Sequence, residues 1–401
     1  MKKIYLSAPG LVCCAGKNRN ELYESCLNGY QGGLVMSALP GQGGKFPVGY
    51  IGEELPAAVF SEPSQYAGDT KIIRVINAAL EQLRPAIEKA VAQYGPEKIG
   101  ICYGSGDSGS EASLLAHRAL FANNAFPQDY SLRFQGAFAV EFISRKFGVC
   151  GPAFSVATAC ASGASAIVRG AELIRAGHCG AVIAGGADIV SPTVFAGFHA
   201  LEAISDSLTN PFSKNRKGIN LGEGAAFFLL DADAISGVAL LGAGESADAH
   251  HMTAPGPDGA GPARAMRAAL QSAGITGEQI GYVNLHGTGT PLNDITESLA
   301  MQTVFGAAYP PSPPVSSTKP VTGHTLGAAG ALEAAICWMA LTEQRGLPLH
   351  CWDGVKDDEI PFSPVDGSSI IDGSVKEAPA ICMSNSFGFG GCNVSLILGR
   401  A

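Results

Sequence analysis

The chain has 401 residues, 46 % hydrophobic and 15 % charged, which indicates a compact globular enzyme long enough for two core-forming units. Its net charge of −9 argues against nucleic-acid binding, which needs a concentrated basic surface, and its apolar runs are too short to span a membrane. The 11 cysteines follow no disulfide framework and no secretory segment follows Met1, so we expect a reduced, cytoplasmic protein.

Short β-rich runs alternate with longer alanine-rich helical stretches along the chain. In the first part we predict strands at 3–7, 99–104, 181–186 and 225–230, and helices at 71–94 and 161–176. In the second part, which begins near residue 238, we predict strands at 281–285, 314–317, 380–384 and 394–398, and helices at 262–273 and 327–341. This alternation predicts an α/β layered architecture.

The two sets of elements predict similar halves joined near residues 231–237. The run that starts at Cys160 follows a strand and opens a helix, and the run that starts at His324 does the same in the second half. A pseudo-twofold arrangement would bring these helix starts together, although Gly-Ala pairs also arise by chance in a chain so rich in both residues. Small residues permit close helix packing, so we expect buried helices between two sheets.

Cys160 is the candidate nucleophile. It lies where an apolar strand breaks into small residues just before a helix, and the unpaired backbone N–H groups and dipole of a helix start favour an anion. These forces are expected to lower the thiol pKa toward neutrality. A lone cysteine is more often buried and inert, so its partners decide the interpretation.

Two histidines in the second half are candidate partners of Cys160. His286 ends a predicted strand and opens a turn rich in glycine and threonine, and His324 lies at a strand-to-helix transition five residues after Lys319. Each histidine alone is more often a surface or core residue. Together, a thiolate, two neutral imidazoles and an ammonium suit thioester chemistry, in which the thiolate takes an acyl group and the imidazoles stabilise an enolate.

A glycine-rich segment at 384–393 contains two aromatic residues, Phe387 and Phe389. Its backbone N–H groups are suited to half of an oxyanion hole, with an aromatic controlling access; the alternative is an ordinary turn before the last strand. We expect no metal, because the chain has no close Cys-x-x-Cys pair. We expect no nucleotide cofactor either, because no glycine-rich stretch has the required spacing.

Five ordered motifs together resemble the elongating 3-oxoacyl-acyl-carrier-protein synthases, the ketosynthases of the thiolase fold. The motifs cover nearly the whole chain and lie at 158–163, 210–218, 286–291, 319–330 and 385–393. The resemblance implies two duplicated βαβαβαββ halves in a five-layer α-β-α-β-α sandwich. Residues 1–235 would carry the nucleophile and residues 236–401 the two histidines.

The resemblance implies a decarboxylating Claisen condensation in fatty-acid or specialised polyketide or polyene biosynthesis. Cys160 would receive an acyl chain from acyl carrier protein, and malonyl-acyl carrier protein would be decarboxylated and condensed with it to give 3-oxoacyl-acyl carrier protein. His286 and His324 would drive decarboxylation and hold the enolate oxygen. Lys319, tied to Glu333, would orient the site rather than act directly.

The same resemblance assigns the substrate contacts and partners. The backbone N–H groups of Cys160 and Phe389 would form the oxyanion hole, with Phe389 as a gate and Phe387 beside the substrate. Thr288 and Thr290 would bind the phosphopantetheine arm, which the carrier protein brings, so no cofactor of the chain's own is expected. The chain would form a homodimer, or a heterodimer with a homologous subunit, with the acyl tunnel reaching the interface.

Three residues depart from the family pattern. Ile219 stands where a phenylalanine usually lies near the malonyl carboxylate, and Asp107 stands where a small or apolar residue usually lines the deep acyl pocket. A carboxylate beside a saturated tail is costly unless it is paired or hydrated. Glu202 replaces a residue that is often basic and contacts the carrier protein. Carrier docking would then rely more on other basic residues, namely Lys71, Arg74, Arg133 and Lys214.

These departures favour a specialised pathway over housekeeping elongation, and they keep alternatives open. A thiolase would normally have one catalytic histidine and a second active-site cysteine, and an initiating synthase would pair cysteine with histidine and asparagine, so His324 argues against both. A non-catalytic chain-length factor, which shapes the tunnel of a heterodimer, would usually lack the nucleophile that Cys160 provides.

Overall fold

The computed structural model describes residues 3–38, 43–52, 55, 70–107, 109–127, 137–234, 237–306, 313–343, 345–360 and 378–401. Within these ranges no helix has the length and apolar character that crossing a membrane would require.

Helices and strands alternate along most of the chain. The strands are β1 (Ile4–Leu6), β2 (Gly10–Cys13), β3 (Val35–Ala38), β4 (Lys45–Val48), β5 (Ile99–Gly104), β6 (Ala153–Val156), β7 (Ala181–Asp188), β8 (Gly224–Asp231), β9 (Val238–Ala247), β10 (Tyr282–Asn284), β11 (Val315–Ser316), β12 (Ile381–Gly388) and β13 (Cys392–Arg400). The α-helices are α1 (Arg19–Asn28), α2 (Lys71–Glu81), α3 (Arg84–Tyr94), α4 (Ser110–Asn123), α6 (Ala137–Phe147), α7 (Ser162–Arg175), α8 (Pro192–Ala200), α9 (Ala260–Ala273), α10 (Pro291–Phe305), α11 (Lys319–Thr322) and α12 (Ala329–Thr342). Short 3₁₀ turns are η1 (Pro96–Lys98), η2 (Ala159–Ala161), η3 (Gly277–Gln279), η4 (Leu326–Ala328) and η5 (Phe389–Gly391).

The large sheet repeats one pairing pattern. Among the described residues it has 11 strands, in the order β11-β10-β12-β13-β9-β1-β8-β7-β5-β6, with β2 paired to β8. In the first half β5 is parallel to β6 and β7, and β7 is antiparallel to β8. In the second half β10 is parallel to β11 and β12, and β12 is antiparallel to β13. The predicted duplication of the fold is confirmed. The boundary at residues 235 and 236 stays a prediction.

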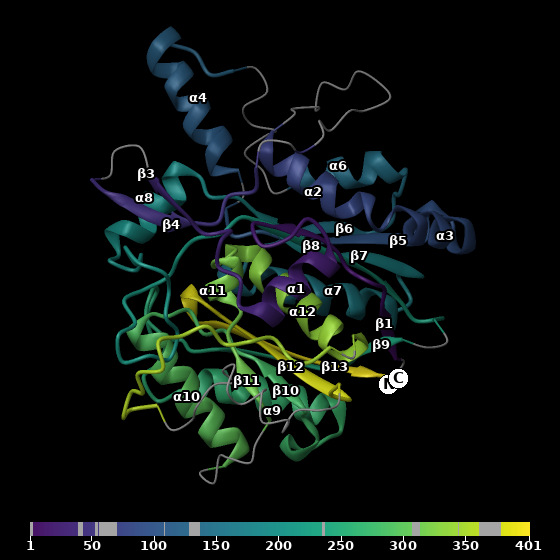
Figure 1. Ribbon diagram of the computed structural model, residues 1–401. Coiled ribbons are helices and arrows are strands. Elements are labelled where there is room, and N and C mark those ends of the chain that lie inside the picture. Colours follow the sequence, from purple (N-terminus) through teal and green to yellow (C-terminus); the bar gives the residue numbers. More distant parts are fainter. Residues whose placement is uncertain are drawn as a thin grey trace.

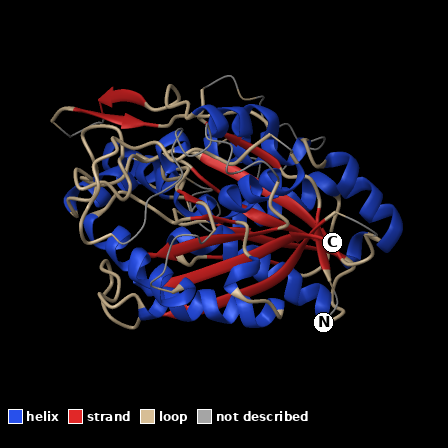
Figure 2. Cartoon of the chain, turned by 60° about the horizontal axis from the view of Figure 1, so that its bottom comes forward, coloured by secondary structure: helices blue, strands red, loops and turns tan. Residues whose placement is uncertain are grey.

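The two expected sheets share one hydrogen-bonded ladder, because β1 pairs with β8 on one side and with β9 on the other. Figures 1 and 2 both show the two chain termini at the same side of the molecule, and the order of the sheet places the first and last strands, β1 and β13, on either side of β9. The prediction of two separate sheets is therefore wrong in one respect: the two parts are joined through β1 into one sheet. The first strand has two free edges, and antiparallel pairing fills both.

Helices form three of the five layers. Helices α7 and α12 lie between the two parts of the sheet, α2, α3 and α6 cover one outer face, and α9 and α10 cover the other (Figure 1). The central helices pack closely because their first turns contain small residues. A Cβ added at Gly163 would lie only 2.9 Å from the carbonyl oxygen of Gly327 and from the Cβ of Ala331.

Two predicted helices differ from those observed. The stretch 71–94 is divided into α2 and α3 near Pro85, because proline cannot donate a helical hydrogen bond but fits the first turn of a new helix. The stretch 327–341 begins instead with η4, and α12 follows it.

The correspondence between the two central helices also differs from the prediction. Cys160 is the middle residue of η2, and Gly327 is the middle residue of η4. Each follows a non-glycine residue with left-handed backbone, Ala159 with φ 50° and Leu326 with φ 53°. By its place in the turn, Cys160 therefore corresponds to Gly327, which lies three residues beyond His324. The prediction paired Cys160 with His324 because it aligned the Gly-Ala pairs and not the turns.

Four strand ends deliver the candidate residues to one place. Cys160 follows β6, His286 follows β10, Lys319 follows β11, and Phe389 follows β12 directly. Parallel strands bring their carboxyl ends to the same edge of a sheet, which is where ligands bind in α/β proteins. The contact between η2 and η4 joins the two halves there.

Candidate active site

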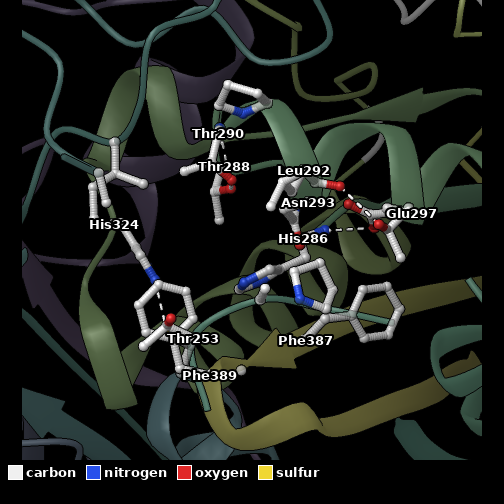
Figure 3. A pocket seen from close by; sticks show the side chains of 18 of the residues that line it. Thr253, His286, Thr288, Thr290, Leu292, Asn293, Glu297, His324, Phe387 and Phe389 are labelled. Carbon is white, nitrogen blue, oxygen red and sulfur yellow. Dashed lines mark hydrogen bonds between the residues drawn. The ribbon is translucent and has the colours of Figure 1, made fainter. Parts of the chain in front are cut away.

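A cavity of about 380 Å³ lies where the two halves meet. Its walls include Cys160, His286, His324 and Phe389, together with Thr288 and Thr290. Figure 3 shows both imidazoles directed into this cavity, with the two threonines on one side and the aromatic residues of the C-terminal loop on another.

The thiol and the two imidazoles are in close contact. Cys160 Sγ lies 3.0 Å from His324 Nε2. The rings of His286 and His324 have centroids 5.5 Å apart and are nearly perpendicular, at 86°. All three side chains are buried. The two helix starts meet, as the sequence predicted, and they place the Cys160 thiol within hydrogen-bond distance of the His324 imidazole.

Lys319 fixes the orientation of His286. Its ammonium is bonded to the Glu333 carboxylate and to the carbonyl oxygen of His286, and it lies 3.4 Å from His286 Nδ1. Because an ammonium only donates, Nδ1 must accept, and the ring proton of neutral His286 is then on Nε2. The predicted link between Lys319 and Glu333 is present, and both residues are buried.

Charge at the site is governed by burial. Burial raises the pKa of the Cys160 thiol to about 11, and the Lys319 ammonium and the backbone N–H of Phe389 offset only part of this rise. The expectation of a thiol pKa near neutrality is therefore wrong for the resting site. Burial and Lys319 hold the pKa of both histidines well below the usual value, so both imidazoles are neutral, as the chemistry requires.

The C-terminal loop brings a backbone donor to the thiol. The Phe389 N–H donates to Cys160 Sγ, and a Cβ added at Gly388 would lie 3.1 Å from the Cys160 nitrogen. The Phe389 ring lies 5.6 Å from the Phe198 ring, at the cavity wall. Gly390, with φ 81°, provides the left-handed turn that lets the loop approach so closely.

Other predicted residues have distinct positions. Thr288 and Thr290 line the cavity with hydroxyl oxygens 2.9 Å apart. Buried Ile219 also lines it, and the Phe387 ring lies 6.0 Å from the His286 ring. Asp107 is not among the described residues that line this cavity.

The departures Asp107 and Glu202 occupy different environments. Asp107 is half-buried in the loop after β5, and burial raises the pKa of its carboxyl group. Glu202 is exposed and contributes to the cavity wall. Lys71 is paired with Glu223 and lies over the Tyr50 ring. Arg133, which we expected to help carrier docking, lies outside the described residues.

The buried carboxylates of α10 were not predicted from the sequence. Glu297 accepts hydrogen bonds from the backbone N–H groups of His286, at 2.8 Å, and Gly287, at 2.7 Å. Asp294, one turn earlier, accepts from Phe212 and Gly289. Two acids three residues apart, just after a turn rich in glycine, share one helix face, and that spacing was a usable signal.

The donor set resembles that of a metal site. The ligand atoms of Cys160, His286 and His324 lie within 4.8 Å of one another, and sulfur with two imidazoles is a set that zinc accepts. The nearby Lys319 ammonium opposes a bound cation. The absence of a metal stays a prediction.

Comparisons with known proteins agree over the whole chain. Residues 64–234 match the model of the beta-ketoacyl synthase N-terminal domain, and residues 238–350 match that of the C-terminal domain. The 3-oxoacyl-[acyl-carrier-protein] synthase 2 of Vibrio cholerae is 38 % identical over 77 % of this chain and 78 % of its own length. The protein of the same name from Coxiella burnetii is 32 % identical over 100 % of this chain and 99 % of its own.

Solved structures give the same picture. A chain in the complex of the ketosynthase ApeO with its chain length factor ApeC from Xenorhabdus doucetiae has a TM-score of 0.89 and 37 % identity, covering 100 % of this chain and 98 % of that one. A chain of the ishigamide ketosynthase/chain length factor has a TM-score of 0.86 and 27 % identity, with coverage of 100 % and 99 %.

Proposed function

Because this chain belongs to the beta-ketoacyl synthase family, it is a condensing acyltransferase of fatty-acid or polyketide biosynthesis, and we propose that Cys160 carries the acyl chain. The reaction is the decarboxylating Claisen condensation of an acyl thioester with malonyl-acyl carrier protein. The observation that carries the proposed roles is the 3.0 Å contact between Cys160 Sγ and His324 Nε2, beside the perpendicular ring of His286.

The first step is acyl transfer. Cys160 Sγ attacks the thioester carbonyl carbon while its proton passes to His324 Nε2. Because the resting thiol has a pKa of about 11, proton transfer accompanies attack and no free thiolate needs to accumulate. The tetrahedral oxyanion accepts from the N–H groups of Cys160 and Phe389. The carbon–sulfur bond to the carrier breaks, and the carrier thiolate takes the proton from His324.

The second step is loss of carbon dioxide. The malonyl thioester oxygen accepts hydrogen bonds from the Nε2–H of neutral His286 and from the Nε2–H of neutral His324, whose ring proton must first move from Nδ1 to Nε2 after the acyl transfer. The bond to the carboxylate breaks, and its electron pair forms the enolate that these donors stabilise. Ile219 provides an apolar surface in the cavity, and an apolar surface favours conversion of a carboxylate to neutral carbon dioxide.

The third step forms the carbon–carbon bond. The enolate carbon attacks the acyl carbon on Cys160, and the oxyanion again accepts from the Cys160 and Phe389 N–H groups. Collapse expels the Cys160 thiolate, which takes a proton from solvent, and 3-oxoacyl-acyl carrier protein leaves. Lys319 and Glu333 keep His286 in its donating tautomer throughout.

The partner that we propose is an acyl carrier protein, whose phosphopantetheine arm would pass Thr288 and Thr290. The cavity wall contains both threonines, and their hydroxyl groups suit the amides of such an arm. On this proposal the chain needs no cofactor of its own. Relatives include both synthases named for acyl carrier protein and a ketosynthase solved with a chain length factor.

Intact-mass measurement tests the assignment of the nucleophile. Incubation with an acyl carrier protein loaded with an acyl chain should add one acyl group to the wild-type chain and none to Cys160→Ala. Failure of the wild-type chain to gain the group would favour a non-catalytic chain-length factor.

Labelled malonyl carrier protein tests the histidines. Because each imidazole donates to the enolate, His286→Ala and His324→Ala should each lower carbon dioxide release by about a hundredfold or more. Ser207→Ala, an exposed position outside the cavity wall, is the matched control. Unchanged release in both histidine variants would refute their role in decarboxylation.

A further inference from the structure

Asp188, at the end of β7, has a fully buried carboxylate that the catalytic steps above do not use. Its Oδ1 accepts from the Ser105 hydroxyl at 2.6 Å and the Asp107 N–H at 3.1 Å. Its Oδ2 accepts from the Gly106 N–H at 2.7 Å and the Gly327 N–H at 2.6 Å. One carboxylate thus joins the loop after β5 to the turn η4.

The turn η4 lies next to His324, and the loop after β5 contacts the turn that holds Cys160. Gly327 lies three residues after His324, in a turn that Leu326 enters with left-handed backbone. On the other side, the Ser162 hydroxyl oxygen lies 3.3 Å from the Ser105 carbonyl oxygen. That hydroxyl accepts from the Thr158 N–H and donates to the Ala159 carbonyl, on the turn that holds Cys160.

The backbones that Asp188 joins are in direct contact. A Cβ added at Gly327 would lie 2.3 Å from the Gly106 nitrogen and 2.6 Å from Asp188 Oδ2. Four donors converging on one buried carboxylate allow little freedom for either segment, because each N–H would lose its partner if the carboxylate moved.

Because the fold is duplicated, the contact between the Gly327 N–H and Asp188 can be compared with its counterpart in the first half. Gly327 occupies in η4 the place that Cys160 occupies in η2, and each follows a residue with positive φ. The N–H of Cys160 is one of the two proposed oxyanion donors. Its counterpart, the N–H of Gly327, binds an anion that belongs to the chain itself. On the proposed function, the turn in the first half would donate an N–H to the substrate oxyanion, and the turn in the second half donates to the Asp188 carboxyl group.

We propose that Asp188 is a positioning residue of the condensation: it fixes the turn after His324 against the loop beside Cys160, and so maintains the approach of His324 to the thiol. This inference rests on the proposed roles of Cys160 and His324. In the second half, the turn η4 then binds the Asp188 carboxyl group, whereas the corresponding turn η2 would bind the substrate oxyanion.

Asp188→Asn tests the proposal with little change in volume. The amide NH₂ cannot accept from the N–H groups that one carboxylate oxygen now serves. We expect kcat per acylatable site to fall about tenfold to a hundredfold, because small displacements of reacting groups have effects of this size. The KM for malonyl carrier protein should stay unchanged, since the threonines of the cavity wall are untouched.

Counting acylatable sites by intact mass separates positioning from a loss of folded protein. Asp231→Asn is the control: Asp231 pairs with Ala181 at the opposite end of the same two strands that pair Asp188 with Gly224. It should retain the wild-type kcat. If Asp188→Asn has the wild-type kcat per acylatable site, or if its loss lies wholly in the number of such sites, the proposal is overturned.

If Asp188→Asn does not fold, Ser105→Ala tests the positioning role of Asp188 instead. This variant removes one donor to Oδ1 and leaves the three backbone donors in place. A severalfold fall in kcat with unchanged KM and an unchanged number of sites supports positioning; wild-type kcat overturns it. A Cys160→Ala chain that still condenses would instead refute the proposed function itself.

Discussion

Cys160, His286 and His324 illustrate how burial changes the chemistry of single residues. A helix start alone favours a thiolate, yet the desolvation of this thiol outweighs the nearby ammonium and N–H donor. The same desolvation keeps both imidazoles neutral. A neutral imidazole with its ring proton on Nε2 can donate to an enolate oxygen, and the contact with Lys319 already holds His286 in that tautomer in the resting site.

The rate of Cys160 alkylation by iodoacetamide should rise steeply with pH. The thiolate is the reactive form, so below a pKa of about 11 each pH unit should increase the rate roughly tenfold, without a plateau between pH 7 and 10. The ionisable groups that act on the thiol are Lys319, Asp188, Glu333, His286 and His324, and both histidines stay neutral over this range.

Peptide mass spectrometry after timed alkylation gives the rate at Cys160 separately from the other cysteines. The Cys160→Ala chain identifies modification elsewhere. A plateau reached below pH 9 would contradict the raised pKa and restore the expectation of a helix-activated thiolate.

At the level of elements, small residues allow α7 and α12 to bring the turns η2 and η4 together. Gly163 is in the first turn of α7, where the backbone of Ala331 and the carbonyl of Gly327 leave no room for a methyl group. The close approach of the helices therefore depends on the absence of a side chain, and any methyl group there must separate the layers.

Gly163→Ala should lower the free energy of unfolding by about 1–3 kcal/mol, the usual cost of overpacking a core. Gly197→Ala is the matched control, because Gly197 lies inside α8 and a Cβ there would meet nothing within 4 Å. This second change should raise the free energy of unfolding by about 0.5–1 kcal/mol through helix propensity. Urea denaturation of both variants measures these changes. Equal effects of the two would contradict close packing at Gly163.

At the scale of the whole molecule, β6 is the outermost strand beside β5 and has no second neighbour among the described strands. Its residues from Ala153 to Ser155 are exposed, including the large ring of Phe154. A free strand edge offers N–H and C=O groups to another chain. We therefore predict that the dimer that the family resemblance implies, with a second copy or a homologous subunit, forms at this edge.

Phe154→Lys should weaken a dimer formed at this edge by about tenfold or more, because association would bury an unpaired ammonium. Val35→Lys, an exposed change on β3 in the separate two-stranded sheet, should leave association unchanged. Sedimentation velocity over a range of concentrations measures both. An unaltered dimer in Phe154→Lys would move the interface elsewhere.

Most of the elements and the candidate reacting residues could be predicted from the sequence. The strand at 99–104 was predicted with its observed bounds, because a short apolar run between turn residues is a local signal. Cys160, His286, Lys319 and His324 were identified because each combines a reactive side chain with a strand end or helix start. Such features depend on neighbours along the chain, which a sequence displays directly.

The tertiary structure alone determined how these groups affect one another. The sequence could not reveal that burial raises the pKa of Cys160, that β1 joins the two halves of the sheet, or that Cys160 corresponds to Gly327. Nor did any local pattern connect Asp188 with Gly327, which lies 139 positions away. Desolvation and contacts between distant segments depend on packing in three dimensions, whereas the chemistry of each side chain is already present in the chain.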